Sequence, residues 1–177
     1  MNANVNNNKN KAQKNFKVTP EMLKNGEVLN ALVLRFLNNR NKENMFSLLS
    51  CLRDSNVFLA ANVDALAKDT EVGGKGDNPV MFPVKQKITI TPQIYKATDG
   101  KLYIPIFSRK ENARQEHLKG ASLVNLPFIN CIAILKDYED CSRFVLDPHL
   151  YNVVLDEDLI RITQKLPSRL GTQRNTK

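Results

Sequence analysis

The chain has 177 residues with a formal net charge of +8, 42% hydrophobic residues and 25% charged residues, which is typical of one globular domain with a sizeable core. No stretch approaches the roughly 18 consecutive apolar residues of a membrane span, and the polar beginning lacks the apolar segment of a secretory signal. We therefore expect a soluble, cytoplasmic protein with no membrane partner.

The excess positive charge lies at the two ends of the chain. Eight of the 26 basic residues precede residue 18 or follow residue 164, and the other 18 are balanced by 18 acidic residues. Low hydrophobicity predicts disordered tails at residues 1–18 and 167–177, on either side of a single domain at residues 19–166. Because a nucleic-acid groove places Lys and Arg on the folded surface, nucleic acid is not the expected partner. Weak, salt-sensitive binding of a polyanion through the tails is an alternative.

The first part of the domain is predicted to be helical. Thr19-Pro20 is typical of a helix start, and Asn25-Gly26 is typical of a break. Apolar residues then recur at helical spacing over residues 27–38 and again after Asn41. The short link between these two segments predicts an antiparallel helical hairpin.

Strands are predicted in the middle of the chain. Residues 57–60 form a short apolar run, and the polar, Gly-containing stretch 64–85 is predicted to be a mobile loop. Residues 88–94 alternate apolar and polar side chains, which is typical of a half-buried strand. A turn at Thr98-Asp99-Gly100 and a second strand at residues 102–107 complete a predicted β-hairpin.

Two further helices are predicted after the hairpin. Ser108 to Glu111 has the order of a capping box, which predicts a short polar helix ending near Lys119. Asn125 is expected to cap a helix that carries apolar residues at helical spacing from Phe128 to Leu135, although so short an apolar run also fits a strand.

The last elements complete an α+β pattern. Strands are predicted at residues 143–146 and 151–155 around an Asp147-Pro148 turn, and Asp156 is expected to cap a helix with Leu159 and Ile162 inward. The fold class is therefore α+β. We expect a mixed, largely antiparallel sheet with a β-hairpin, flanked by the N-terminal helical hairpin and further helices.

Residue types that carry chemistry do not converge in the sequence. The glycines near Lys75 lack the order of a phosphate-binding loop, and His117 and His149 lie far apart without metal-ligand spacing. We expect no catalytic residue, no metal and no cofactor. An enzyme that pairs Cys141 with His149, assisted by Asp147, is kept as an alternative, although nothing in the sequence lowers the pKa of the thiol.

One strand-to-helix junction carries a positive signal for binding. At Phe107, Ser108 and Arg109 a predicted strand ends and a predicted helix begins, so backbone N–H groups and cations gather there. Such a junction can hold an anion or the carboxylate of a partner. If the sheet brings Asp147 and Pro148 to the same edge, these five residues form the expected contact surface for a protein or a small ligand.

The same segments resemble a known family. Residues 99–113, DGKLYIPIFSRKENA, are similar to the N-terminal domain of the SseB family, with Pro105, Phe107 and Ser108 at the positions of its Pro, Phe and hydroxyl motif. Residues 143–160 also resemble the family, with Asp147 where Asn is frequent and Pro148 retained. The likeness spans roughly residues 27–165, and it implies the fold and no catalytic residue. The 64–85 stretch looks expanded, and the second domain of longer members is missing. We therefore expect a non-catalytic binding or protein-interaction module.

Overall fold

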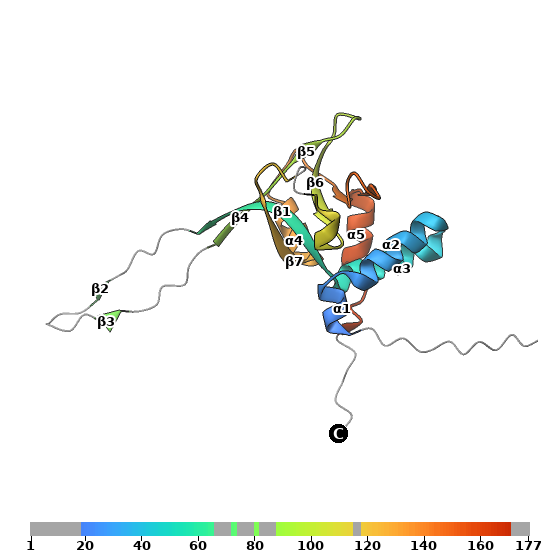
Figure 1. Cartoon of the computed structure of the whole chain (residues 1–177), viewed down its shortest axis with the longest axis horizontal. Helices are drawn as coiled ribbons and strands as arrows, with labels where there is room; N and C mark the ends of the chain where they lie inside the picture. Colours follow the sequence, from blue (N-terminus) through green and yellow to red (C-terminus); the bar gives the residue numbers. More distant parts are fainter. Residues whose placement is uncertain (1–18, 66–71, 74–79, 82–87, 115–117, 171–177) are drawn as a thin grey trace, which may run out of the picture.

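The computed structural model describes residues 19–65, 72–73, 80–81, 88–114 and 118–170 (Figure 1). Both predicted tails therefore lie largely outside the described residues. The described start of the C-terminal one is held against the domain, because Ser168 Oγ donates to Asp54 Oδ1 at 2.7 Å and Arg169 N–H donates to Asp54 Oδ2 at 2.7 Å. The domain thus extends past the predicted boundary at residue 167.

The N-terminal helices follow the sequence prediction. Helix α1 (Pro20–Lys24) is capped by the Thr19 hydroxyl, and α2 (Glu27–Asn38) begins after Gly26, whose left-handed backbone separates the two helices. Helix α3 (Lys42–Asp54) is capped by Asn41, whose Oδ1 accepts the Asn44 N–H at 2.8 Å. Helices α2 and α3 lie side by side, so the predicted helical hairpin is confirmed (Figure 1).

A seven-stranded sheet forms the centre of the domain, in the order β4-β1-β6-β8-β9, with β7 paired to β1 and β5 paired to β6. Every pairing is antiparallel except that of β6 with β8, so the predicted α+β class with a mixed, largely antiparallel sheet is confirmed. The strands are β1 (Asn56–Ala65), β4 (Ile88–Pro92), β5 (Tyr95–Lys96), β6 (Leu102–Phe107), β7 (Ser122–Pro127), β8 (Phe144–Leu146) and β9 (Val153–Leu155).

The pairing of the middle strands differs from the prediction. Strand β1 is longer than expected and pairs through its second half with β4, so β4 is not the partner of β6. Only β5 forms the hairpin with β6. Within the predicted 64–85 loop, Asp64 and Ala65 belong to β1, and β2 (Val72–Gly73) pairs with β3 (Val80–Met81). The rest of that stretch lies outside the described residues.

Two predicted helix starts are wrong. After Ser108 the chain forms only a 3₁₀ turn, η1 (Lys110–Asn112), without a side-chain cap. Asn125 lies in β7, and α4 (Phe128–Leu135) begins directly after Pro127. At the third start Asp156 does cap α5 (Glu157–Lys165), as predicted. Leu159 packs partly buried on the core as predicted, beside the buried Ile160 and Thr163, whereas Ile162 is 44% exposed.

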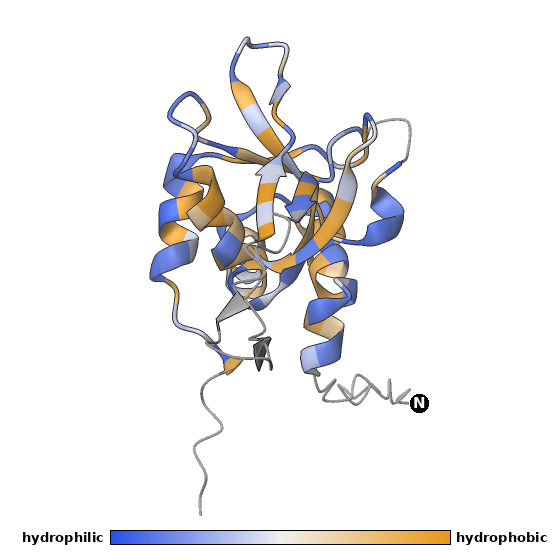
Figure 2. Ribbon diagram, turned by 90° about the vertical axis from the view of Figure 1, so that its left-hand side faces the viewer, coloured by the Kyte–Doolittle hydropathy of each residue, from blue (hydrophilic) through white to orange (hydrophobic). Residues whose placement is uncertain are grey.

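One hydrophobic core joins the helices to the sheet. Phe128 of α4 and Phe144 of β8 meet edge to face, with ring centroids 5.4 Å apart, and both are fully buried. In Figure 2 the helices are orange on one side and blue on the other, as expected for elements that cover a shared core. No helix in the described ranges has the length and apolar character needed to span a membrane.

Candidate functional site

The structure brings the predicted contact residues together, but inside the domain. Ser108 follows β6 and Asp147 follows β8, and the parallel pairing of these strands places the two residues side by side. The Ser108 N–H donates to Asp147 Oδ1 at 2.9 Å, and the Ser108 hydroxyl donates to Asp147 Oδ2 at 2.7 Å. Both residues are 0% exposed, and Phe107 and Pro148 are buried beside them. A partner therefore cannot reach Ser108 or Asp147 in this conformation.

Two half-buried asparagines complete what we call the buried polar cluster, after its two fully buried members: Asn30, Ser108, Asn112 and Asp147. The Asn112 side-chain amide donates to Asp147 Oδ1 at 3.0 Å and to Asn30 Oδ1 at 3.1 Å. Because Asn30 belongs to α2, the cluster connects the helical hairpin to the ends of β6 and β8. Sequence analysis missed both asparagines. Asn30 had one signal, since it interrupts the apolar stripe of α2 between Leu29 and Val33.

Gly26 seals the cluster from the side of α1 and α2. Its φ is +79°, and a Cβ atom added to it would lie 1.7 Å from the carbonyl oxygen of Ser108. The backbone of the helix break is therefore packed directly on the backbone of the junction. Sequence analysis treated Asn25-Gly26 only as a break and gave this close approach no role.

The electrostatics of Asp147 are those of a structural group. Burial raises the pKa of its carboxyl, while the hydrogen bonds from Ser108 and Asn112 act in the opposite direction. Its backbone is left-handed, with φ +50°, and its carbonyl accepts from the N–H groups of the following turn, those of Leu150, Tyr151 and Asn152. Side chain and backbone together hold the β8–β9 turn against β6.

Arg109 is the exposed part of the predicted surface. Its side chain is 40% exposed and its Nε lies 3.2 Å from Glu111 Oε2. The turn η1 has only three residues, so it lacks the helix dipole that was expected to attract an anion at this junction. Binding through Phe107, Ser108, Arg109, Asp147 and Pro148 stays a prediction that the geometry of Ser108 and Asp147 does not favour.

The alternative catalytic group of Cys141, His149 and Asp147 gains no geometric support. Burial raises the pKa of the Cys141 thiol, whose sulfur lies 3.8 Å from the Arg143 carbonyl oxygen. The carboxylate of Asp147 accepts hydrogen bonds from Ser108 and Asn112, while His149 is exposed on the turn. Within the described ranges, no group of three or more His, Cys, Asp or Glu side chains is arranged to hold a metal ion.

The cysteines are expected to be slow nucleophiles in the folded protein. Burial raises the pKa of Cys131 to about 12, so at pH 8 this residue holds roughly a thousandfold less thiolate than an ordinary cysteine. Mass spectrometry after brief iodoacetamide treatment should find Cys131 and Cys141 unmodified, and all three cysteines modified in urea. Rapid modification of Cys141 in the folded chain would instead revive the catalytic alternative.

An ion pair fixes the hairpin turn to the start of β8. The Arg143 guanidinium donates to both carboxylate oxygens of Asp99, at 2.7 and 2.8 Å, and to the Lys101 carbonyl oxygen at 3.2 Å. These contacts hold the pKa of Asp99 at about 2, chiefly through the hydrogen bonds from Arg143. A depressed pKa stabilises the fold above pH 3.8, and this contribution is lost as the pH falls toward 2.

Replacing Arg143 with methionine should therefore raise the pKa of Asp99 toward 3.8. Carboxyl carbon NMR over an acid titration measures this change directly. Lys101→Met is the matched control, because the Lys101 charge makes the smallest contribution while its backbone N–H still bonds Asp99. An Asp99 pKa that is already ordinary in the wild type would show that this ion pair does not form in solution.

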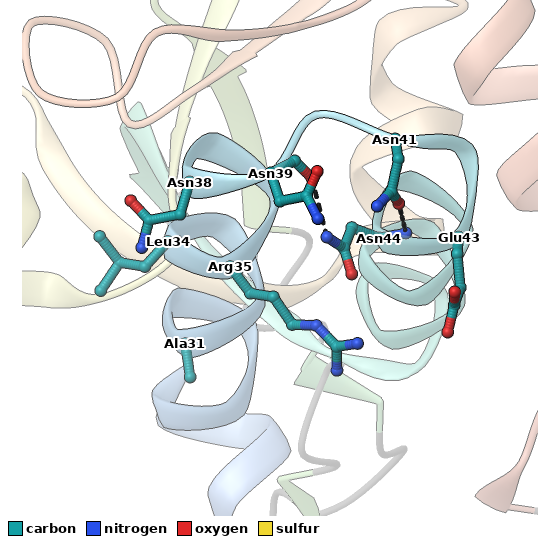
Figure 3. Close-up of a pocket in the computed structure, with 8 residues that line it drawn as sticks. All are labelled: Ala31, Leu34, Arg35, Asn38, Asn39, Asn41, Glu43 and Asn44. Atoms are coloured by element: carbon teal, nitrogen blue, oxygen red, sulfur yellow. Dashed lines mark hydrogen bonds between the residues drawn. The ribbon is translucent and has the colours of Figure 1, made fainter.

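A polar hollow lies where α2 turns into α3 (Figure 3). Three of its asparagines close the turn: Asn44 Nδ2 donates to the Asn39 carbonyl oxygen at 2.8 Å, its N–H donates to Asn41 Oδ1, and Asn44 is buried. The hollow thus shows how the helical hairpin is closed. Its lining residues are Ala31, Leu34, Arg35, Asn38, Asn39, Asn41, Glu43 and Asn44.

A second hollow, which we call the apolar groove, lies between the helical hairpin and α5. Its volume is about 680 Å³, and its surface is largely apolar. Phe46 is 52% exposed and Ile162 is 44% exposed, so two large apolar side chains face solvent there. Sequence analysis missed this groove because it predicted Ile162 to be inward. Its lining residues are Phe36, Arg40, Asn41, Lys42, Met45, Phe46, Leu49, Leu159 and Ile162.

Comparison with known proteins agrees with the resemblance seen in the sequence. The family model described as the SseB protein N-terminal domain matches residues 29–161, which include α3, the whole seven-stranded sheet and the buried polar cluster. No curated protein and no solved structure matches the chain.

Proposed function

We propose that this chain, which belongs to the SseB family through its residues 29–161, is a non-catalytic binding module whose partner is another protein. The observation that carries the proposal is the apolar groove, where Phe46 and Ile162 remain exposed beside Met45 and Leu159. Exposed apolar side chains that gather in a hollow are typical of interaction surfaces.

The distribution of polar groups supports the same proposal. Ser108 and Asp147 form hydrogen bonds with each other and with neighbouring asparagines, so they hold the fold together. Next to Ser108, the Arg109 side chain is paired with Glu111. The exposed feature that favours binding is therefore the apolar surface of the groove, and not a set of reactive side chains. Its cysteines are all free thiols, which fits a cytoplasmic setting for this binding.

Site-specific photo-crosslinking tests the proposal. A photoreactive phenylalanine analogue is placed at Phe46 in one protein and at Ile88 in another, and both are irradiated in cells that produce them. Ile88 is a suitable control because it is an exposed apolar residue on β4, which lies far from α2 and α3 (Figure 1). A discrete heterologous product from position 46 and none from position 88 supports protein binding. Absence of any product from position 46 overturns it.

A further inference from the structure

We infer that the apolar groove binds an acidic, amphipathic α-helix of a protein partner. The inference rests on the proposed function and adds the secondary structure and charge of the bound segment. Apolar side chains of that helix would pack on Phe46, Met45 and Ile162, and its carboxylates would pair with Arg40 and Lys42 at the end of the groove.

The walls of the groove favour a helix over an extended segment. They come from α2, α3 and α5, with Arg40 and Asn41 from the turn between α2 and α3, and the described lining contains no strand residue. The backbone hydrogen bonds of the three helices are made within each helix. An extended peptide placed there would leave its own N–H and C=O groups without partners on an apolar surface. A helix satisfies these groups internally and offers apolar side chains at a spacing of three and four residues.

The positive charge at the groove favours a bound segment with negative charge. Arg40 and Lys42 are the charged members of the described lining, and both are exposed. Neither takes part in an ion pair with another described residue. The neighbouring Glu43 belongs to the polar hollow on the other side of the turn (Figure 3). Acidic groups on a bound helix would therefore find two cations whose charge is not neutralised locally.

Side-chain exposure increases from the centre of the groove to its sides. Leu49 is buried at its floor, Phe36, Met45 and Leu159 are half-buried, and Phe46 and Ile162 stand exposed. This gradation provides a buried centre with apolar sides, the arrangement in which a few central side chains supply most of the binding energy.

The test uses two labelled model peptides of roughly four helical turns, each with leucines at helical spacing. One carries glutamate at the remaining positions and the other carries lysine. Fluorescence anisotropy with the full chain should give a dissociation constant at least about tenfold lower for the acidic peptide, with the difference shrinking at high salt. Equal affinity for both peptides, or preference for the basic one, overturns the inference.

Variants tie the binding to the groove. Phe46→Asp should weaken binding of the acidic peptide at least about tenfold, whereas Ile88→Asp should leave it unchanged. The double variant Arg40→Glu and Lys42→Glu alters only exposed side chains and should reverse the preference toward the basic peptide. Circular dichroism melts establish that each variant is folded. An unchanged preference in the double variant would refute the charge assignment.

The two experiments separate the two proposals. A crosslinked protein at position 46 together with no preference for the acidic peptide would leave the binding module standing and reject the helix. Absence of any product from position 46 would reject the module itself, and the helix inference with it.

Discussion

Replacing Gly26 with alanine is expected to lower the free energy of unfolding by about 3 kcal/mol or more, from strain and overpacking together. The left-handed φ of +79° disfavours any residue with a Cβ atom. The larger effect is steric, because that atom would stand 1.7 Å from the Ser108 carbonyl oxygen and neither backbone can yield locally. The helix break must then move away from β6, which would open the hydrogen bond from Asn112 to Asn30.

Gly100→Ala provides the matched control for this prediction. Gly100 has a φ of +81°, but an added Cβ would meet no atom within 4 Å. It therefore bears the same backbone strain without the collision, and a loss of about 1 kcal/mol is expected. Urea denaturation of the two variants measures the difference. Equal losses would mean that Gly26 is needed only for its backbone angle, and that the contact with Ser108 contributes nothing.

Local patterns predicted the elements that local interactions determine. The spacing of Leu29 and Val33, which are both fully buried, was enough to predict α2 within its observed bounds. Asp156 was predicted to cap a helix, and this is confirmed, because a side-chain cap depends only on residues three positions away. The family resemblance implied the overall fold, and the match to the SseB N-terminal domain confirms that resemblance.

Long-range pairing set the limits of these predictions. Nothing in residues 88–94 indicates that they pair with the second half of β1. The alternation of apolar and polar side chains shows that one face of a strand is buried, but it does not identify the neighbouring strand. Ser108 has the sequence of a helix cap, yet Asp147, 39 positions away, takes its hydroxyl. An N-cap hydroxyl accepts from a backbone N–H, whereas the Ser108 oxygen accepts from the Asn112 side-chain amide at 3.0 Å and its proton is donated to Asp147, so the capping box does not form. The same hydrogen bond between Ser108 and Asp147 buries residues that were predicted to form a contact surface.

Replacing Asp147 with alanine should lower the free energy of unfolding by about 3 kcal/mol, whereas Asp147→Asn should change it by less than about 1 kcal/mol at pH 7. Alanine leaves the buried Ser108 N–H and hydroxyl without an acceptor, and it tolerates the left-handed φ of +50° poorly. Asparagine keeps an acceptor for the Ser108 N–H, tolerates that backbone angle and has no ionisable group to bury. Urea denaturation distinguishes the two, and equal losses would show that the cluster requires the charge itself.

The pH dependence of the same pair reports the state of the carboxyl. Because burial raises the pKa of Asp147 above 3.8, its protonated form stabilises the folded chain fully below that pH. This contribution is lost as the pH rises through the folded-state pKa, while Asp147→Asn has no such group to titrate. The free energy of unfolding of the wild type minus that of Asp147→Asn should therefore decrease from pH 4 upward. Taking the difference cancels the opposite contribution of Asp99, which both proteins share. A difference that grows with pH would mean that the hydrogen bonds from Ser108 and Asn112 outweigh desolvation, and that the carboxylate is held in its ionised form.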